Sequence, residues 1–474
     1  TRRSGVLPPS LFTSTNLSNG ISIPYFFDIS KDKNFTLTNR FYATENPLFT
    51  GEYNQAFKNS NFLVDFGYTE GYKKASTTKK SGDKSHFFSK FVNNFTSDTS
   101  ESVLSLSLQN VSDDKYLKLY KIKSNLVDFS KNTLENKLDF THENENIFFG
   151  LNASIYETLN DTYNDKYEYI LPEITIDKNL TSSEKFGNID IQSNYKTHNY
   201  DTNKLTNFFV NDLNWNSQNF FFKSMFKNKF IGNIKNINYD TKNVSPFKDD
   251  FTSELYGSLG FLTELSFKKD RKTSIHSITP KSFFRFAPGS MRKEDSGRRL
   301  DFSNAFSINR LDDLNNFETG LSGTLGFEYE IENENNNDFN FSVAQIINEK
   351  ENKKMHSKTS LNQKLSDLVG SATLEIDDTF SLNYNFALDQ NYKDLNYNEF
   401  GAAANFGSLD VDLNYLQEKK HIGNQNYFKG KINLKNDDKG LLSFETKRNL
   451  ITDSSEFYNL SYEYINDCLK AGIA

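Results

Sequence analysis

The chain has 474 residues, a net charge of −7, a single cysteine and a polar mean hydropathy of −0.68. With 8 Pro and 23 Gly it is neither collagen-like nor a proline-rich linker, and a lone cysteine excludes an internal disulfide. No run approaches the ~18 apolar residues of a membrane helix. A transmembrane β-strand, however, turns only every second residue to lipid, so low mean hydropathy is compatible with a membrane barrel.

Aromatic residues are abundant, with 45 Phe, 24 Tyr and 1 Trp. Barrel walls place such residues toward lipid and in girdles, although an AT-rich genome would also raise these counts. The acidic balance without a basic stripe argues against nucleic-acid binding.

The first stretch, Arg2 to Tyr53, is typical of paired strands interrupted by Pro9 and Pro24. Proline cannot donate to a β-ladder, so it belongs at edges, strand ends or bulges. The sequence therefore predicts a sheet that begins with a weak edge. If the Pro9 strand lay in the middle of a sheet, this interpretation would be wrong.

Period-two alternation of apolar and polar residues, the signature of strands with one apolar face, recurs along the whole chain. The apolar positions of the clearest examples are Leu104, Leu106 and Leu108; Leu255, Leu259, Phe261, Leu265 and Phe267; Phe339, Phe341 and Val343; Phe380, Leu382, Tyr384, Phe386 and Leu388; and Leu442 and Phe444.

Strand length favours a membrane barrel over a soluble sandwich. Strands of about ten residues suit a tilted membrane crossing, whereas a sandwich of this size would break into modules of about 100 residues, and no linker is visible. The fold class predicted is all-β, a large antiparallel transmembrane β-barrel of roughly two dozen strands. The chain starts at Thr1 and stops within a predicted strand, Lys470 to Ala474. We therefore expect residues 1–474 to be one barrel domain whose preceding domain, export signal and last strands lie outside this sequence.

Polar segments predict the connections. Short turns are expected at Asp113 to Lys115, Asn160-Asp161 and Asn436 to Gly440, and long loops of one barrel mouth at Lys73 to Ser85 and Tyr239 to Asp250. The nearest approach to a helix, Lys353 to Leu368, has poor helical periodicity.

Enzyme signatures are weak. The six histidines, at positions 86, 142, 198, 276, 356 and 421, lack metal-ligand spacing. There is no G-x-S-x-G, H-E-x-x-H or glycine-rich phosphate loop, so we expect no enzyme, no metal and no cofactor. A Ser-His-carboxylate site assembled only in three dimensions stays open as an alternative.

The cluster Arg298-Arg299-Leu300-Asp301 allows two interpretations. Arginine forks match phosphate geometry, but an ion-pair network supporting the barrel is favoured, so the cluster is not predicted to be a binding site.

Several segments, in order along the chain, resemble the LPS-assembly protein LptD (organic solvent tolerance protein) family. SGVLPPS (Ser4 to Ser10) and ISIPYFFDI (Ile21 to Ile29) resemble its barrel-opening segments and their spacing, followed by NFTLTNRFY (Asn34 to Tyr42) and LFTGEY (Leu48 to Tyr53). DDKYLKLY (Asp113 to Tyr120), YILPEI (Tyr169 to Ile174), the block from Ile278 to Arg310, and YEYINDC (Tyr462 to Cys468) are similar to later segments. Two positions depart from the pattern: Asn39 stands where the family often has Pro, and Pro8 adds a proline beside Pro9.

The resemblance implies a barrel of about 26 strands that lies in the outer membrane of a Gram-negative bacterium and transports and inserts lipopolysaccharide. The lipid tails of lipopolysaccharide would pass laterally between the first and last strands, with Pro9 and Pro24 as lateral-gate residues, and its sugar would pass through the lumen. Cys468 would form a disulfide to the N-terminal domain outside this sequence; a free thiol is the alternative. The implied partners are lipopolysaccharide, outer-membrane lipids, a plug lipoprotein of the LptE type and, through that N-terminal domain, a periplasmic bridge protein of the LptA type.

Three rival readings remain. A large porin or plugged receptor would pass solutes and need an unbroken first-strand seam. An extracellular β-rich adhesin would turn its apolar faces inward. An outer-membrane enzyme would need a catalytic constellation.

Overall fold

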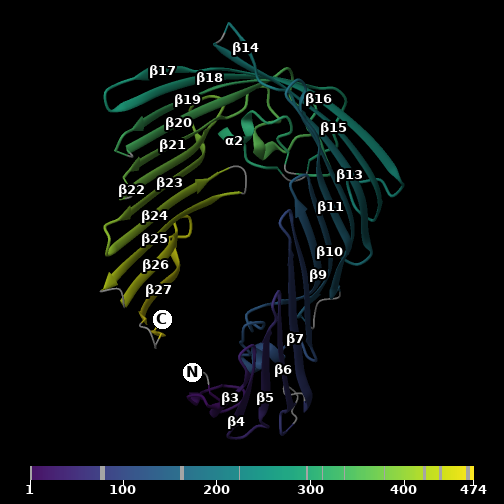
Figure 1. Ribbon diagram of the computed structural model, residues 1–474, viewed down its shortest axis with the longest axis vertical. Helices are drawn as coiled ribbons and strands as arrows, with labels where there is room; N and C mark the ends of the chain where they lie inside the picture. The colour runs from purple at the N-terminus through teal and green to yellow at the C-terminus, as the bar shows by residue number, and fades with distance from the viewer. Residues whose placement is uncertain are drawn as a thin grey trace. The chain divides into compact units, whose positions relative to one another are not determined.

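The computed structural model describes residues 3–74, 81–160, 165–223, 225–294, 297–311, 313–335, 337–377, 379–419, 423–436, 440–465 and 470–473 (Figure 1). This part of the chain forms 28 strand segments, two short α-helices and one 3-10 helix, and the strand segments belong to one sheet. The neighbouring strands for which a register is given all pair antiparallel, for example Pro280 with Phe327 and Val411 with Ile432. This is the all-β antiparallel class that the alternation predicts. Within the described ranges, no helix has both the length and the apolar character needed to cross a bilayer.

The elements follow the chain as β1 Gly5–Val6, β2 Ser10–Phe12, β3 Gly20–Ser30, β4 Lys33–Tyr42, β5 Leu48–Ala56, β6 Ser60–Gly71, β7 Ser81–Thr96, β8 Ser100–Val111, α1 Tyr116–Tyr120, β9 Thr133–Asn144, β10 Ile147–Thr158, β11 Tyr167–Ser183, β12 Gly187–Tyr200, β13 Lys204–Asn216, β14 Phe220–Phe222 and β15 Phe226–Lys242. They continue as β16 Thr252–Leu265, β17 Phe267–Asp270, β18 Ser274–Ala287, α2 Phe302–Ala305, β19 Gly320–Asn333, β20 Asn337–Asn348, the 3-10 turn Ser357–Thr359, β21 Leu368–Ile376, β22 Phe380–Leu388, β23 Leu395–Asn405, β24 Leu409–Glu418, β25 Gln425–Asn436, β26 Gly440–Asn449, β27 Ser454–Ile465 and β28 Lys470–Ile473.

Three strands are interrupted. β1 and β2 both pair with β3, β13 and β14 both pair with β15, and β16 and β17 both pair with β18. The 28 described segments therefore occupy 25 strand positions, in agreement with the predicted two dozen.

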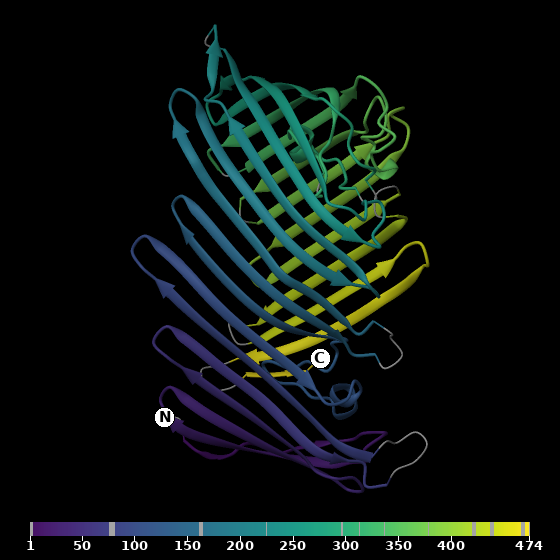
Figure 2. The ribbon, with the colours of Figure 1, turned by 90° about the vertical axis from the view of Figure 1, so that its right-hand side faces the viewer.

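The chain divides into two compact units. Unit 1 comprises residues 1–180, 190–212 and 237–254, and unit 2 comprises residues 181–189, 213–236 and 255–474. Figure 2 shows the strands of unit 1 as successive hairpins in chain order, from β3 (purple) to β10 (blue).

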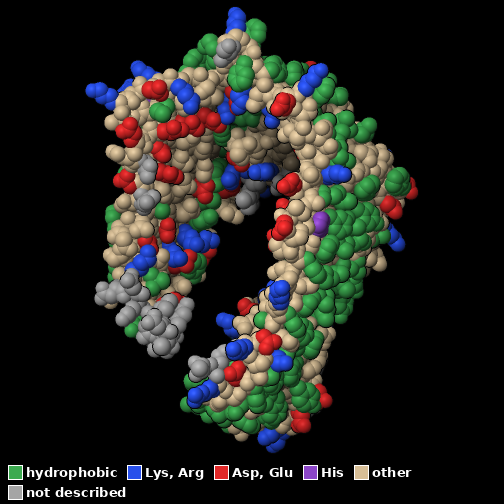
Figure 3. Space-filling view, viewed as in Figure 1, with side chains coloured by type: hydrophobic (Ala, Val, Ile, Leu, Met, Phe, Trp, Pro, Cys, Tyr) green, Lys and Arg blue, Asp and Glu red, His purple; other side chains and the backbone are tan. Residues whose placement is uncertain are grey.

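The sheet of unit 1 has one apolar and one polar face. In β6, Phe66 and Tyr68 are 41% and 45% exposed, whereas the alternate residues Asp65 and Thr69 are buried. Figure 3 shows the apolar face of the strands β6 to β10 as a nearly continuous hydrophobic surface. The apolar residues thus point to the outside and the polar residues toward packed loops. This arrangement is the reverse of a soluble sandwich and contradicts the adhesin reading.

Unit 2 repeats the pattern. In β18, Phe284 and Phe286 are exposed, and Phe283 and Arg285 are buried on the opposite face. Register carries the apolar face across neighbouring strands, because Phe284 pairs with Phe261 and Phe286 with Leu259. A one-residue slip would turn these rings to the other face.

Connections alternate between two kinds. One set is mostly tight, comprising residues 31–32, 57–59, 97–99, 145–146, 184–186, 271–273, 334–336, 377–379 and 406–408, with the longer hairpin 217–225. The other set contains the long loops 112–132, 243–251, 288–319 and 349–367. Successive antiparallel strands place the two sets at opposite strand ends.

Several expected connections differ in the structure. Asp113 to Lys115 is not a tight turn but opens the 112–132 loop that contains α1. β7 already begins at Ser81 and β15 continues to Lys242, so the two expected loops are shorter than predicted. Between positions 353 and 368 only Ser357–Thr359 is helical, as a 3-10 turn. Residues 75–80, 161 and 437–439, named in these expectations, lie outside the described residues.

Candidate functional site

Pro9 and Pro24 lie within a few residues of each other in register on neighbouring strands at the start of the sheet, with Leu7 opposite Pro24. Val6 pairs with Tyr25, and the next register, Ser10 with Ser22, is shifted by one residue. Two residues, Pro8 and Pro9, therefore stand opposite one residue of β3, which is a β-bulge. Bulges are among the few sheet positions that tolerate proline.

The backbone of Pro24 faces the first strand. Its carbonyl oxygen accepts a hydrogen bond from the N–H of Leu7, at 2.9 Å. In an antiparallel ladder, a residue's N–H and C=O point to the same side, so the donor that Pro24 lacks is missing from the β1–β3 seam and not from the β3–β4 ladder. There, Pro24 keeps its regular register with Thr38. Pro8, Pro9 and Pro24 together remove three N–H donors within one short stretch, which we call the proline seam.

Cys468, predicted to be a disulfide partner, lies outside the described residues.

The 112–132 loop folds onto the polar face of unit 1 and forms its main hydrophobic core. Tyr116, Leu117 and Tyr120 of α1 are buried against Leu17, from the turn between β2 and β3, and Tyr42 at the end of β4. The Tyr42 ring meets Phe12 edge-on with centroids 5.2 Å apart. The far end of the first hairpin is therefore packed into the same core as α1.

Polar contacts fasten this loop. Arg40 donates from Nη1 to the carbonyl oxygen of Tyr120 at 2.8 Å, and Lys84 Nζ lies 2.7 Å from Asp113 Oδ2. His86 is buried, with Nδ1 3.0 Å from the Tyr116 hydroxyl and Nε2 2.5 Å from Asp65 Oδ1.

Ionisation follows these contacts within the loop. Burial raises the pKa of the Tyr120 phenol to about 12. Burial would raise the pKa of Asp113, but the hydrogen bond from Lys84 and the other favourable contacts hold it below 3.8. Tyr120 is therefore neutral and Asp113 charged at neutral pH.

Gly67 of β6 makes room for the loop. A Cβ at this position would lie 2.5 Å from His86 Cε1 and 2.9 Å from the Tyr116 hydroxyl. Only glycine lets the Asp65–His86–Tyr116 chain approach the strand this closely. No short-range sequence signal identifies Gly67, because its contacts come from another strand and from α1.

Unit 2 has a second core on its polar face. The 288–319 and 349–367 loops supply Met291, Leu300 and Leu361, which are buried with Ile346 of β20 and Tyr397 of β23. The helix α2 begins with a capping box, in which the Asp301 side chain accepts from the Asn304 N–H and the Asn304 side chain accepts from the Asp301 N–H.

A buried ion network joins the 288–319 loop to the sheet. Glu318 pairs with Arg310, which also donates to Ser322 at 3.1 Å, and Arg285 of β18 lies 3.8 Å from Glu318. All three charged side chains are almost fully buried. Burial would raise the pKa of Glu318, but Arg310 and Arg285 hold it below its ordinary 4.5. The network was not predicted from the sequence, because the sequence does not distinguish a charged residue that the fold buries from one that stays in solvent.

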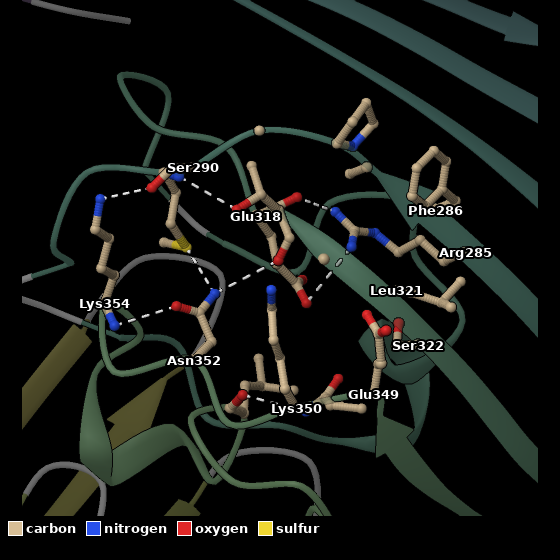
Figure 4. A pocket seen from close by; sticks show the side chains of 18 of the residues that line it. Arg285, Phe286, Ser290, Glu318, Leu321, Ser322, Glu349, Lys350, Asn352 and Lys354 are labelled. Atoms are coloured by element: carbon tan, nitrogen blue, oxygen red, sulfur yellow. Dashed lines mark hydrogen bonds and ion pairs between the residues drawn. The ribbon is translucent and has the colours of Figure 1, made fainter.

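A cavity of about 350 Å³, lined by both charged and apolar residues, lies beside this network (Figure 4). Lys354 Nζ donates to Ser290 at 2.7 Å, and Asn352 donates to Met291 Sδ at 3.3 Å. These bonds tie the 349–367 loop to the 288–319 loop across the cavity. Its charged lining is mixed and comprises Arg285, Lys350, Lys354, Glu318, Glu349 and Glu351. The cavity therefore lies between two connected loops and has no dominant charge.

The Arg298 to Asp301 cluster behaves as the ion-pair interpretation predicts. Arg299 donates to Glu418 Oε2 at 2.9 Å, and its guanidinium carbon lies 3.3 Å from the Tyr397 ring centroid. Asp301 is occupied as the cap of α2. Among the described residues, no three His, Cys, Asp or Glu side chains are grouped to hold a metal ion.

Comparison with known families identifies the chain. No curated protein matches it. The family model LptD, "LPS transport system D", matches residues 84–463 and so covers most of the chain, although it starts beyond the proline seam. The matched region runs from β7 to β27 and includes the 112–132 and 288–319 loops. This chain therefore belongs to the LptD family of outer-membrane β-barrel proteins that transport and assemble lipopolysaccharide.

Proposed function

We propose that this chain inserts lipopolysaccharide into the outer leaflet of the outer membrane and releases it sideways where the first strand meets the last. The observation that carries the proposal is the proline seam. The family assignment supports the transport role and a non-enzymatic activity, since LptD is a transport family.

The proline seam holds the first strand only weakly to β3, so the strand that borders the proposed opening can be displaced at low cost. Separating two strands in hydrocarbon leaves N–H and C=O groups without partners, at several kcal/mol each. The first strand lacks the N–H donors of Pro8 and Pro9, and the facing strand β3 lacks that of Pro24, before any opening starts. The bulge at Pro8 and Pro9 also interrupts the β1–β3 ladder. The first strand is thus easier to displace than a regular strand.

Only one end of the first hairpin is free to move in this proposal. Phe12 and Leu17, at the long-loop end, are packed against the 112–132 loop. Val6 and Leu7, on the other side of the bulge, are exposed. Opening then starts at the Gly5–Val6 end and pivots on the packed turn.

Orientation and partners follow from the family and from the connections. Outer-membrane barrels carry short turns on the periplasmic side and long loops outside, so the tight connections would face the periplasm. A bridge protein of the LptA type would deliver lipopolysaccharide there, through a domain preceding this sequence. A plug lipoprotein of the LptE type would occupy the polar interior. Cys468 would form a disulfide with that preceding domain in the oxidising periplasm, which a mobility shift on non-reducing gels, lost in Cys468→Ser, would test.

Site-specific photocrosslinking in cells tests lateral release. A photoreactive residue replaces Val6 or Leu11, which flank Pro9 and are 63% and 84% exposed, in the protein expressed from its full-length gene. Leu255, an exposed apolar-face residue of β16, is the matched control. We expect lipopolysaccharide adducts at positions 6 and 11 that require an active transport bridge, and weak bridge-independent adducts at 255.

Equal adduct yields at all three positions would indicate general contact with membrane lipid and contradict lateral release. A complete absence of adducts in a surface-inserted protein would favour the porin or receptor alternative. In that case the family relationship would describe the fold alone.

A further inference from the structure

The hairpin between β13 and β15 carries a run of exposed apolar residues at its tip, whereas the tight connections 57–59 and 406–408 each carry a single exposed ring. Residues 220–222 are three consecutive phenylalanines that form β14, and Phe221 and Phe222 are 64% and 61% exposed. Met225 and, in the neighbouring turn 184–186, Phe186 are also exposed. By contrast, the tight connection 271–273 reads Arg-Lys-Thr. We call Phe186, Trp215, Phe220, Phe221, Phe222 and Met225 the aromatic tip.

The two hairpin ends of the aromatic tip are fastened to each other. The indole N–H of Trp215 donates to the carbonyl oxygen of Phe186 at 2.7 Å, and the Gln218 amide donates to the carbonyl oxygen of Ser183 at 3.1 Å. Gly187 has φ +85°, and a Cβ there would overlap the carbonyl oxygen of Asn216. The exposed rings are therefore held on a built platform and not on a loose loop.

The aromatic tip continues the apolar face of unit 2. The Phe220 ring stacks on Phe230 with centroids 5.6 Å apart, and Phe230 lies 5.0 Å from Phe261. Phe261 pairs with Phe284 in the outward-facing register. The ring of Trp215 lies against Gly232. Gly232 points to the same face of β15 as Phe230 and the exposed Ile234, because these residues are two apart along the strand, so Trp215 lies on the apolar face as well.

Cationic side chains border the rings. Lys185 Nζ lies 5.4 Å from the Phe186 centroid, and Lys223 Nζ lies 5.6 Å from the Phe222 centroid. Figure 3 shows hydrophobic side chains around the β14 hairpin, at the top of the view, with a basic side chain at its end. Glu184 is the acidic residue of the same turn. Rings flanked by lysines, with a tryptophan whose N–H is satisfied, match the composition of membrane–water interfaces.

We infer that the aromatic tip is a lipid anchor that sits in the interfacial zone of the glycerophospholipid leaflet, with Lys185 and Lys223 at its anionic headgroups. The apolar occupant follows from the continuity of the tip with the membrane-facing surface, and the headgroup preference follows from the two lysines. The choice of leaflet rests on the proposed orientation, because the tip belongs to the tight-connection end. Such an anchor fixes the depth of the β11 to β15 hairpins in the bilayer.

Trp215 provides the probe, because it is the single tryptophan of this sequence. The full-length protein is reconstituted in nanodiscs of phosphatidylethanolamine and phosphatidylglycerol containing lipids spin-labelled either near the headgroup or deep in the acyl chain. Subtracting the signal of Trp215→Phe isolates the fluorescence of Trp215. We expect quenching about twofold stronger with the shallow label than with the deep label, as for an interfacial ring.

Two variants test the tip itself. Phe221→Asn with Phe222→Asn should reduce shallow quenching of Trp215 by about half, since the rings hold the hairpin in the interface. Phe406→Asn, which removes an exposed ring from another tight connection, is the matched control and should leave the quenching unchanged. Replacing phosphatidylglycerol by phosphatidylcholine should weaken the shallow quenching.

A reporter on the apolar face separates the two proposals. Phe284→Trp in the Trp215→Phe background reports membrane insertion of β18. Quenching of this reporter without quenching of Trp215 would overturn the anchor and leave the transport function intact. Absence of quenching at both positions would overturn the membrane location itself. Shielding of Trp215 from a water-soluble quencher without any quenching by labelled lipid would assign the tip to a protein partner and also overturn the anchor.

Discussion

The carbonyl oxygen of Pro24 accepts a hydrogen bond from Leu7, and Pro24 has no N–H to return one. A hydrogen-bonded pair of an antiparallel ladder normally exchanges two bonds, so this pair is half complete. The missing bond faces the first strand, which is the strand that lateral release must displace. The same proline leaves the β3–β4 ladder in register. Weakness is thus confined to one seam.

Pro24→Ala should strengthen the proline seam. The restored N–H can donate to Leu7, and one such bond contributes about 0.5–1.5 kcal/mol, or several kcal/mol where no water competes. We expect slower lipopolysaccharide delivery to the cell surface, measured by surface labelling after a pulse, and greater sensitivity to large hydrophobic antibiotics. Pro280→Ala, in the interior of β18, is the control, and an equal defect there would remove the special role of Pro24.

Gly67→Ala should loosen the 112–132 loop. The new methyl group would lie within 3 Å of both His86 and the Tyr116 hydroxyl, so the loop must shift or the buried contacts must break. Overpacking of this kind typically costs 1–3 kcal/mol. We expect faster proteolytic cleavage within residues 112–132. The control is Gly257→Ala, whose Cβ would meet nothing within 4 Å, and this variant should be cleaved at the wild-type rate. Cleavage of Gly67→Ala at the wild-type rate would contradict the packing described.

Glu318→Gln should destabilise unit 2. It removes the negative charge that compensates Arg310 and Arg285 in a buried site, and breaking a buried pair in this way costs about 3–5 kcal/mol. The measurement is the midpoint of thermal unfolding in detergent at neutral pH. Glu351→Gln, an exposed carboxylate beside the same cavity, should leave the midpoint nearly unchanged.

The same carboxyl predicts a pH dependence. The pKa of Glu318 is lower in the folded protein than its ordinary 4.5, so the folded state favours the charged form. Its contribution to stability is complete above pH 4.5 and is lost as pH falls through the folded-state pKa. The difference in unfolding midpoint between wild type and Glu318→Gln should therefore shrink in acid. A difference that grows in acid would contradict the assignment.

Arg299→Lys should weaken the contact between the 288–319 loop and the strands β23 and β24. Lysine can keep a charge near Glu418 but cannot stack a planar guanidinium on Tyr397. We expect a loss of about 1 kcal/mol, in the range of cation–π contacts, read as a lower unfolding midpoint. Tyr397→Leu should produce a similar loss, and the double variant should lose little more than either single variant. Additive losses would show that the ring and the guanidinium do not act together.

The sequence alone was sufficient for the strands and for the two faces of the sheet. Alternation at Leu255, Leu259 and Phe261 predicts one apolar face, and these residues do share a face in β16. Side-chain direction in a strand has a period of two and needs no information from distant residues. Pro9 and Pro24 could be recognised for a similar reason, since a proline lacks an N–H in every context.

The tertiary structure decided which segments pack against the polar face of the sheet and which pair of strands loses the hydrogen bond that Pro24 cannot donate. α1 has five residues and α2 has four, too few for a helical period to emerge from sequence. The roles of Gly67, Glu318 and Arg310 depend on partners that lie on other strands and loops. The register of β3 with its neighbours decides whether the missing N–H of Pro24 weakens the pairing with β1 or the pairing with β4. A local pattern reports the conformation of a segment, but burial and hydrogen-bond partners depend on which distant segments the fold brings together.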